Sequence, residues 1–310
     1  MDQIPYKFGQ AVFANFNRFF LFTVDNKLSG VWGEALSFCF KTMKHLQISL
    51  QVIDNKVQYV IIDTHGCYNL EALAKINPQL LVVDLLMTNG DVPGRMFMGV
   101  PSTMTEKSYA DHFLPFLRRI VTEDTHFSIG QPNRFLEIIT KDSPIQNFVL
   151  FKREESMETV GRQVLETVDP IKMLEIVGKA PLNWSEDFLG YVADKFFDGK
   201  IRHLTLPEID FPLGARFVEY LVSGNQKKSQ ELRGVRNFEV ALMERFLEEK
   251  GFVLVDTKSS TNLIHDFRER SYELAGIHAQ FSVTYADDSG YASQFPGSRT
   301  QDSQVYFKIV

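Results

Sequence analysis

Apolar residues along the middle of the chain alternate between two periods. Short apolar runs, typical of strands, are followed by longer stretches with apolar side chains three or four positions apart, typical of helices. The predicted strands cover residues 59–63, 80–86, 126–130, 147–151, 172–178, 200–206 and 252–257. The predicted helices cover residues 69–77, 106–121, 133–141, 156–168, 185–198, 212–223 and 238–250. Alternating strands and helices with short connections predict a parallel sheet covered by helices.

Two of these helices have well-marked ends. Ser185 is placed to cap the start of the helix predicted over 185–198. Gly199 after this helix and Gly251 after the helix predicted over 238–250 stand where a left-handed residue commonly ends a helix. The apolar stripes of the two helices predict which of their side chains the sheet buries. These are Phe188, Val192, Phe196, Val240 and Phe246.

Both ends of the chain depart from the alternating pattern. Residues 4–22 and 31–43 have helical apolar spacing, and Asp54-Asn55 between two alternating runs predicts a hairpin. Residues 278–287 and 304–310 alternate and predict a final antiparallel pair joined by a polar, mobile loop. We therefore expect a helical segment over 1–44, a hairpin plus strand–helix repeat-like domain over 45–258, and a C-terminal β cap over 259–310.

Two architectures satisfy the strand–helix pattern, a doubly wound sheet with helices on both faces and a curved array with helices on one side. Lys172 and Lys200 open corresponding strands 28 positions apart, within the period of about 20–29 residues of leucine-rich repeats. No strand-to-helix loop contains the glycine-rich turn that a dinucleotide fold needs. The sequence thus predicts an α/β fold, an irregular leucine-rich-repeat-like array with a largely parallel sheet and helices on one side.

Composition narrows the function classes. The chain has 310 residues, is 44% hydrophobic and carries a formal net charge of −6, which gives no electrostatic footprint for nucleic acid. Its apolar runs are too short to cross a bilayer, and its first residues do not resemble a signal peptide. Two cysteines provide no disulfide framework. We expect an intracellular protein with neither a nucleic-acid nor a membrane partner.

The sequence offers few candidate catalytic, metal-binding or modification sites. Asp63, His65 and Cys67 alternate at a strand end, but a metal site needs three or four suitable ligands, and a strand end entering a turn explains the trio better. The stretch DSGYAS, in which Ser289 and Ser293 could carry phosphates, resembles a phosphodegron. We predict no catalytic, cofactor-binding or metal-binding residues, and therefore no enzyme activity.

Several short motifs resemble a large protein family expanded in nematodes. They are MDQIPYKF, LSGVWGEA, LEIVGKAPLNWSEDF, KIRHLTLPEIDF and FVEYLVSG. Members of that family are mostly uncharacterised and are described alongside the F-box and F-box-associated proteins of those animals. In F-box proteins an N-terminal three-helix segment binds the Skp-type adaptor of a cullin ubiquitin ligase. The resemblance places Ile4-Pro5 at the start of such a segment and Trp32 near its end.

Three functions follow as expectations. The first is a non-catalytic protein-interaction protein that recognises substrates for a cullin-type ubiquitin ligase, as the resemblance implies. The second is a repeat-like interaction scaffold with no ligase link, in which residues 1–44 cap the array. The third is an enzyme on a doubly wound sheet with an unrecognised site. On the first, the partner-binding residues are Ile4, Pro5, Phe8, Val12, Phe16 and Trp32.

Overall fold

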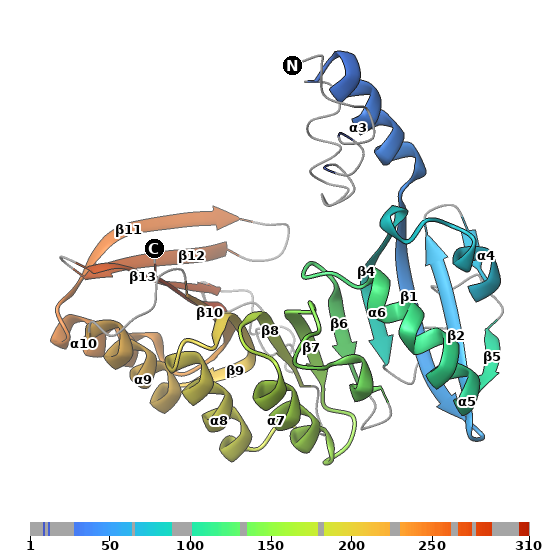
Figure 1. The fold of residues 1–310 in the computed structure, drawn as a ribbon. Coiled ribbons are helices and arrows are strands. Elements are labelled where there is room, and N and C mark those ends of the chain that lie inside the picture. The colour runs from blue at the N-terminus through green and yellow to red at the C-terminus, as the bar shows by residue number, and fades with distance from the viewer. Residues whose placement is uncertain are drawn as a thin grey trace. The chain divides into compact units, whose positions relative to one another are not determined.

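The computed structural model describes most of the chain (Figure 1). The described residues are 9, 12, 28–63, 66–88, 101–130, 135–178, 183–223, 230–261, 266–274, 277–286 and 304–309. Contacts divide the chain into two compact units, residues 1–168 and 169–310. No helix within the described residues is both long enough and apolar enough to span a membrane.

The first unit contains a mixed sheet in the order β7-β6-β4-β1-β2-β3, with β5 paired to β2. Its strands are β1 (Lys44–Ile53), β2 (Lys56–Asp63), β3 (Gly66–Tyr68), β4 (Leu81–Thr88), β5 (Ser102–Thr105), β6 (His126–Ile129) and β7 (Asn147–Phe151). Its helices are α3 (Gly30–Thr42), α4 (Leu70–Ala74), α5 (Glu106–Ser108), α6 (Leu114–Ile120) and α7 (Met157–Thr167), with 3₁₀ turns at Pro78–Leu80 and Leu136–Ile138.

The hairpin between β1 and β2 confirms the prediction at Asp54-Asn55. Both residues have positive φ, 50° and 58°, as a two-residue turn that follows the strand twist requires. β1 then pairs in parallel with β4, β4 with β6, and β6 with β7. Phe113, Phe127 and Phe148 fill the core of this unit and are fully buried.

Two helices of the first unit differ from their predictions. Residues 133–141 were expected to be helical, but their described part holds only the 3₁₀ turn Leu136–Ile138. Leu136, Ile138 and Ile139 are all buried, so the segment is enclosed on several sides instead of presenting one apolar stripe. The predicted helix 106–121 exists, but a π-helical turn at Tyr109–Phe113 interrupts it.

The second unit contains a sheet in the order β11-β12-β13-β14-β10-β9-β8. Its strands are β8 (Ile171–Val177), β9 (Ile201–Asp210), β10 (Glu231–Asn237), β11 (Phe252–Thr261), β12 (Asp266–Leu274), β13 (Ile277–Ala286) and β14 (Gln304–Ile309). Its helices are α8 (Glu186–Phe197), α9 (Phe211–Val222) and α10 (Val240–Glu249). Strands β8, β9 and β10 are parallel, and the remaining pairs are antiparallel.

The helices of the second unit lie along one face of its sheet (Figure 1). Because β8, β9 and β10 follow one another in space as they do in the chain, right-handed crossovers place α8 and α9 on the same side. Phe188, Val192 and Phe196 are buried, as predicted. Val240 and Phe246 are only half-buried, contrary to expectation, because α10 turns Met243 and Leu247 toward the core.

A buried glutamine links backbone carbonyls and a tyrosine hydroxyl beside the aromatic core of the second unit. Gln230, which is 2% exposed, donates from Nε2 to the carbonyls of Phe196 and Ile201 at 2.6 and 3.2 Å. Its Oε1 accepts a hydrogen bond from the Tyr220 hydroxyl at 2.6 Å. These hydrogen bonds give both the nitrogen and the oxygen of the buried Gln230 amide a partner.

The antiparallel half of the second sheet is only partly as predicted. The pairing of β13 with β14 confirms the expected final strand pair, and the polar linker with Ser289 and Ser293 lies outside the described residues. Strands β10 and β12 were not predicted. The strand expected at 252–257 exists as part of β11, but it runs antiparallel to β12 instead of joining the parallel strands.

Candidate functional site

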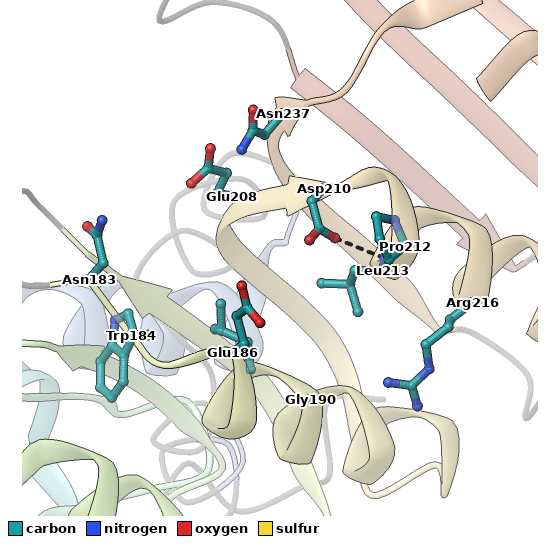
Figure 2. A pocket seen from close by; sticks show the side chains of 11 residues that line it. Asn183, Trp184, Glu186, Gly190, Glu208, Asp210, Pro212, Leu213, Arg216 and Asn237 are labelled. Carbon is teal, nitrogen blue, oxygen red and sulfur yellow. Dashed lines mark hydrogen bonds between the residues drawn. The ribbon is translucent and has the colours of Figure 1, made fainter. Parts of the chain in front are cut away.

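A cleft of about 470 Å³ opens at the carboxyl ends of the parallel strands in the second unit (Figure 2). This edge is where open parallel sheets commonly bind ligands, because the strand ends and the helix N-termini meet there. The cleft is lined by Asn183, Trp184, Glu186, Leu189, Gly190, Glu208, Asp210, Pro212, Leu213, Arg216 and Asn237.

Two side-chain caps fix the helix N-termini at this edge. Ser185 Oγ accepts a hydrogen bond from the Phe188 amide at 3.1 Å, which confirms its predicted role at the start of α8. Asp210 Oδ1 accepts from the Leu213 amide at 2.9 Å at the start of α9. Such caps satisfy amide groups that would otherwise lack partners. The walls of the cleft are therefore held in place by the fold.

Trp184 forms an apolar wall of the cleft. Its Nε1 donates to the Val177 carbonyl at 3.0 Å, and its ring stacks on Phe188 with 4.7 Å between centroids. A Cβ at Gly178 would lie 3.2 Å from Trp184 Cδ1, so a residue without a side chain lets the indole lie close to the end of β8. These contacts fix the indole between the end of β8 and the first turn of α8.

The charges around the cleft are unbalanced. Glu186, Glu208 and Asp210 contribute carboxylates, whereas Arg216 contributes the only positive charge among the described lining residues. Arg216 also donates to Asp194 at 2.6 Å and lies over the Phe197 ring, with Cζ 5.2 Å from the centroid. Figure 2 shows Glu208 beside Asn237 and Arg216 at the other end. The Glu208 end is therefore negative and open to a cation.

A smaller hollow of about 300 Å³ involves the same three strands but contains paired charges. Glu231 on β10 forms an ion pair with Arg233 at 2.5 Å, and His203 Nδ1 on β9 lies 3.5 Å from its carboxylate. The carboxylate here already has partners, unlike Glu186 and Glu208, to which no described residue contributes a hydrogen bond or ion pair. We therefore take the larger cleft as the candidate site.

The predicted partner-binding residues of the N-terminal segment are only partly described. Ile4, Pro5, Phe8 and Phe16 lie outside the described residues, and Val12 is half-buried in a helix. Trp32 is half-buried on α3. It packs against the buried side chains of Ala35, Leu36, Cys39 and Met43, as do Leu80 and Val82. The inward face of α3 therefore belongs to the core of the first unit.

The trio Asp63, His65 and Cys67 forms no described cluster. Asp63 accepts hydrogen bonds from the Gly66 amide at 3.0 Å and the Tyr68 hydroxyl at 2.8 Å, and Lys44 lies 3.5 Å away. His65 lies outside the described residues, and the Cys67 thiol is exposed. Among the described residues no group of three or more potential ligands could hold a metal. Asp63 thus closes the turn between β2 and β3.

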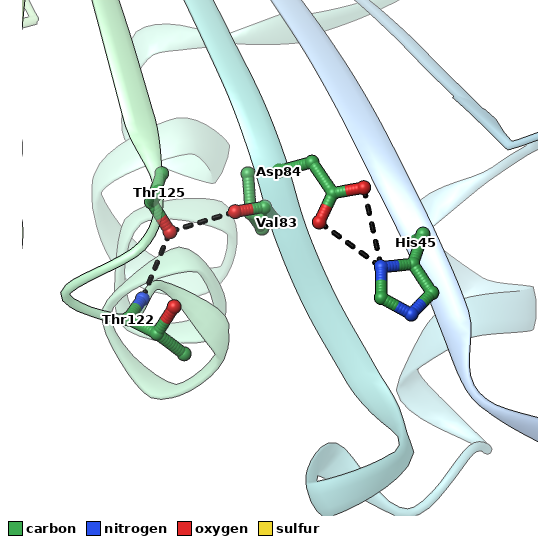
Figure 3. Close-up of polar contacts among 5 residues, drawn as sticks. All are labelled: His45, Val83, Asp84, Thr122 and Thr125. Carbon is green, nitrogen blue, oxygen red and sulfur yellow. Dashed lines mark hydrogen bonds and ion pairs between the residues drawn. The ribbon is translucent and has the colours of Figure 1, made fainter. Parts of the chain in front are cut away.

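A histidine–carboxylate pair in the first unit was not singled out from the sequence (Figure 3). His45 Nδ1 on β1 lies 3.0 and 3.2 Å from the two carboxylate oxygens of Asp84 on β4. Nearby, Thr125 Oγ1 donates to the Val83 carbonyl at 2.7 Å and accepts from the Thr122 amide at 2.9 Å. These contacts join neighbouring segments of the sheet.

Comparison with known proteins identifies no family for this chain. No model of a known protein family matches the chain, and no curated protein or solved structure is significantly similar to it. The functional argument therefore rests on the residues of the chain itself.

Proposed function

We propose that this chain is a non-catalytic protein-interaction protein, and that its cleft receives a basic side chain of a partner protein. The observation that carries the proposal is the pair of carboxylates, Glu186 and Glu208, to which no described residue is bonded. A lysine or arginine side chain would supply the missing donors. Charge-assisted hydrogen bonds of this kind are about twice as strong as neutral ones.

The rest of the cleft suits such a side chain. Lysine and arginine have long aliphatic stems that pack on apolar surface while the charged head reaches polar groups. Trp184 and Leu213 offer the apolar surface, and the amide oxygens of Asn183 and Asn237 can accept further hydrogen bonds. A basic side chain entering between them would be held along its length.

The layout of the helices also supports a scaffold. A doubly wound enzyme has helices on both faces of its sheet, whereas α8, α9 and α10 lie on one face (Figure 1). A one-sided array leaves the other sheet face and the strand ends available for contact with another protein. This arrangement favours an interaction protein over the enzyme alternative.

Affinity purification with quantitative mass spectrometry tests the proposal. The double variant Glu186→Gln/Glu208→Gln removes both charges and keeps the side-chain shape. Its matched control, Glu248→Gln/Glu249→Gln, removes two charges from exposed positions on α10. Loss of two charge-assisted contacts should reduce recovery of the partner at least ~10-fold, and only in the cleft variant. Equal recovery from the wild type and both variants would contradict the proposal.

A second proposal concerns residues 1–44, which we infer to be an F-box-like segment that binds a Skp-type adaptor of a cullin ubiquitin ligase. The supporting observation is an exposed apolar surface at α3, formed by Phe38 on the helix and by Leu28 just before it, which are 38% and 40% exposed. They line a shallow surface that also includes Gly30 and Gly33. Apolar side chains on such a helix face are typical anchors for a helical partner.

The adaptor proposal is tested by co-purification. Replacing Pro5 and Phe8 by Ala, or Phe38 by Asp, should abolish recovery of the adaptor while the thermal melt of the chain stays unchanged. If residues 1–44 serve only as a cap, the Pro5 and Phe8 variant should lower the melting temperature. A wild-type chain that recovers no adaptor would exclude the ligase reading.

A further inference from the structure

The edge strand β11 exposes three consecutive large apolar side chains. Val253, Leu254 and Val255 are 60%, 47% and 50% exposed. Because successive side chains on a strand point to opposite faces, this exposure leaves both faces of β11 uncovered at Val253 to Val255. Within the described residues β11 has one strand neighbour, β12. Its other edge can therefore accept a further strand.

We propose that β11 pairs antiparallel with the β11 of a second copy of this chain, with Leu254 on the two-fold axis. The order Val-Leu-Val is symmetric about Leu254. In this register Val253 faces the second copy's Val255, and the two Leu254 side chains meet. Every exposed apolar side chain of the edge then contacts an apolar side chain, without requiring a matching sequence in another protein.

The charges of the edge fit the same register. Natural edge strands commonly carry a lysine, a proline or an inward charge that prevents pairing. Phe252 to Val255 contain none of these, and the first charged residue, Asp256, would lie opposite the second copy's Phe252 and away from the other carboxylate. No like charges therefore face each other across the five paired residues.

The local geometry limits the assembly to two copies. The pairing of β11 with β12 shifts register between Leu254 and Asp256, which places a bulge at Val255. A bulge bends the strand and increases its local twist, so we expect the outer edge to pair only over a short stretch centred on Leu254. An isologous contact about a two-fold axis also uses the edge of both copies and closes the assembly.

The short contact predicts a weak dimer. Five strand residues span about 17 Å, so the buried area falls below the ~1,200–2,000 Å² of stable complexes. We therefore expect sedimentation velocity of the full chain to show a rising dimer fraction between about 5 and about 500 µM, since association follows mass action.

Charge substitution tests whether dimerisation depends on β11 or on another exposed apolar side chain. Leu254→Lys brings two ammonium groups together at the axis, where directly opposite like charges are destabilising. We expect it to weaken dimerisation at least ~10-fold. The matched control is Leu242→Lys, since Leu242 is an exposed leucine on α10, 38% accessible, and it should dimerise as the wild type does. Circular dichroism establishes that both variants are folded.

Cross-linking provides an independent measurement. Residues opposite each other on antiparallel strands have Cα atoms about 4.5–5.5 Å apart, within the range that a disulfide spans. In a Cys67→Ser background, which removes the exposed thiol and leaves only the buried Cys39, Leu254→Cys should form a covalent dimer on oxidation. Leu242→Cys should not.

Three results would overturn the proposal. They are a wild type that stays monomeric over the whole concentration range, equal weakening by the Leu242 and Leu254 charge variants, and equal cross-linking at both positions. If the wild type stays monomeric while Leu254→Lys loses a different protein, the edge belongs to that partner and self-pairing is wrong. None of these measurements depends on Glu186 or Glu208, so the cleft proposal is judged separately.

Discussion

Apolar side chains on the parallel strands β8, β9 and β10 are buried under α8 to α10. Three consecutive apolar side chains on β11, in contrast, remain open to solvent. Leu174, Leu204 and Leu232 on the parallel strands are at most 1% exposed. The parallel strands are held by helices that follow them in the chain. The edge strand follows α10 but extends beyond it. The comparison shows that one sheet can combine a closed core with an open edge.

The largest effect on stability should come from truncating a buried side chain in the core of the second unit. Phe196 is 2% exposed and contacts the rings of Phe217 and Tyr220 at centroid distances of 5.4 and 6.4 Å. Phe196→Ala should lower the free energy of unfolding by about 3–5 kcal/mol because it leaves a cavity in the aromatic core. Urea denaturation measures the loss. An unchanged midpoint would mean that this face of α8 is not the core.

A glycine on β10 should give the next largest effect. A Cβ at Gly234 would lie 2.6 Å from Ile209 Cδ1 and 3.0 Å from the Leu206 carbonyl oxygen, and Ile209 is fully buried. Gly234→Ala should therefore destabilise the protein by about 1–3 kcal/mol through overpacking.

The control for this substitution lies on α8. A Cβ at Gly190 would meet nothing within 4 Å, so Gly190→Ala should stabilise the helix by about 0.5–1 kcal/mol. Thermal melts of the two variants should shift in opposite directions. A stabilising Gly234→Ala would show that β9 and β10 do not approach as closely as described.

Alkaline pH should affect the antiparallel half. Burial raises the pKa of Tyr272 above its usual range, and its hydrogen bond to Glu244 at 2.7 Å adds to the effect. Below pH ~10 both the folded and unfolded states keep this proton, so the stabilisation is complete. Above that pH the unfolded state releases the proton first, and stability falls by at most about 1.4 kcal/mol per pH unit for this group.

Tyr272→Phe tests this dependence. It should make the decline in the urea midpoint between pH 9 and about 11 shallower. Tyr109 in the first unit is also buried, and its pKa is raised mainly by burial, so Tyr109→Phe is the matched comparison. Identical pH profiles for the wild type and Tyr272→Phe would contradict the assigned environment of this hydroxyl.

The smallest effect should come from the open edge. Val253→Thr replaces a methyl group by a hydroxyl at a position that is 60% exposed, and both residues favour strands. We expect its free energy of unfolding to stay within about 0.5 kcal/mol of the wild type in dilute solution. A loss as large as that of Phe196→Ala would show that β11 is covered in the folded chain.

The sequence was sufficient where local pattern determines structure. Ser185, Gly199 and Gly251 mark helix ends that the structure confirms, the glycines with φ of 72° and 88°. β10 could not be found in the same way, because Arg233, Gly234 and Arg236 interrupt its apolar pattern. Its position depends on the close approach of Gly234 to Ile209, which is a tertiary contact between distant parts of the chain.

The same limit applies to the candidate cleft. Ser185 was recognised as a cap, but Glu208, Asp210 and Asn237 were not singled out. They come together only because the carboxyl ends of β9 and β10 are adjacent. No spacing in the sequence indicates this juxtaposition once β10 itself is missed. The prediction of a one-sided array, in contrast, required only the strand–helix order, the 28-residue spacing of Lys172 and Lys200, and the lack of a glycine-rich strand-to-helix loop.

The coincidence of chain order and spatial order from β8 to β10 has a consequence for how such a protein can change length. A tandem duplication of one strand and its helix, such as residues 171–200, would add a strand–helix unit between existing neighbours and would leave every other connection unchanged. Each unit contacts mainly the units beside it, so stability would change by an increment while the rest of the core stayed intact. The molecule is thus built to vary by whole modules, and each added module would bring its own loop to the edge that holds the cleft.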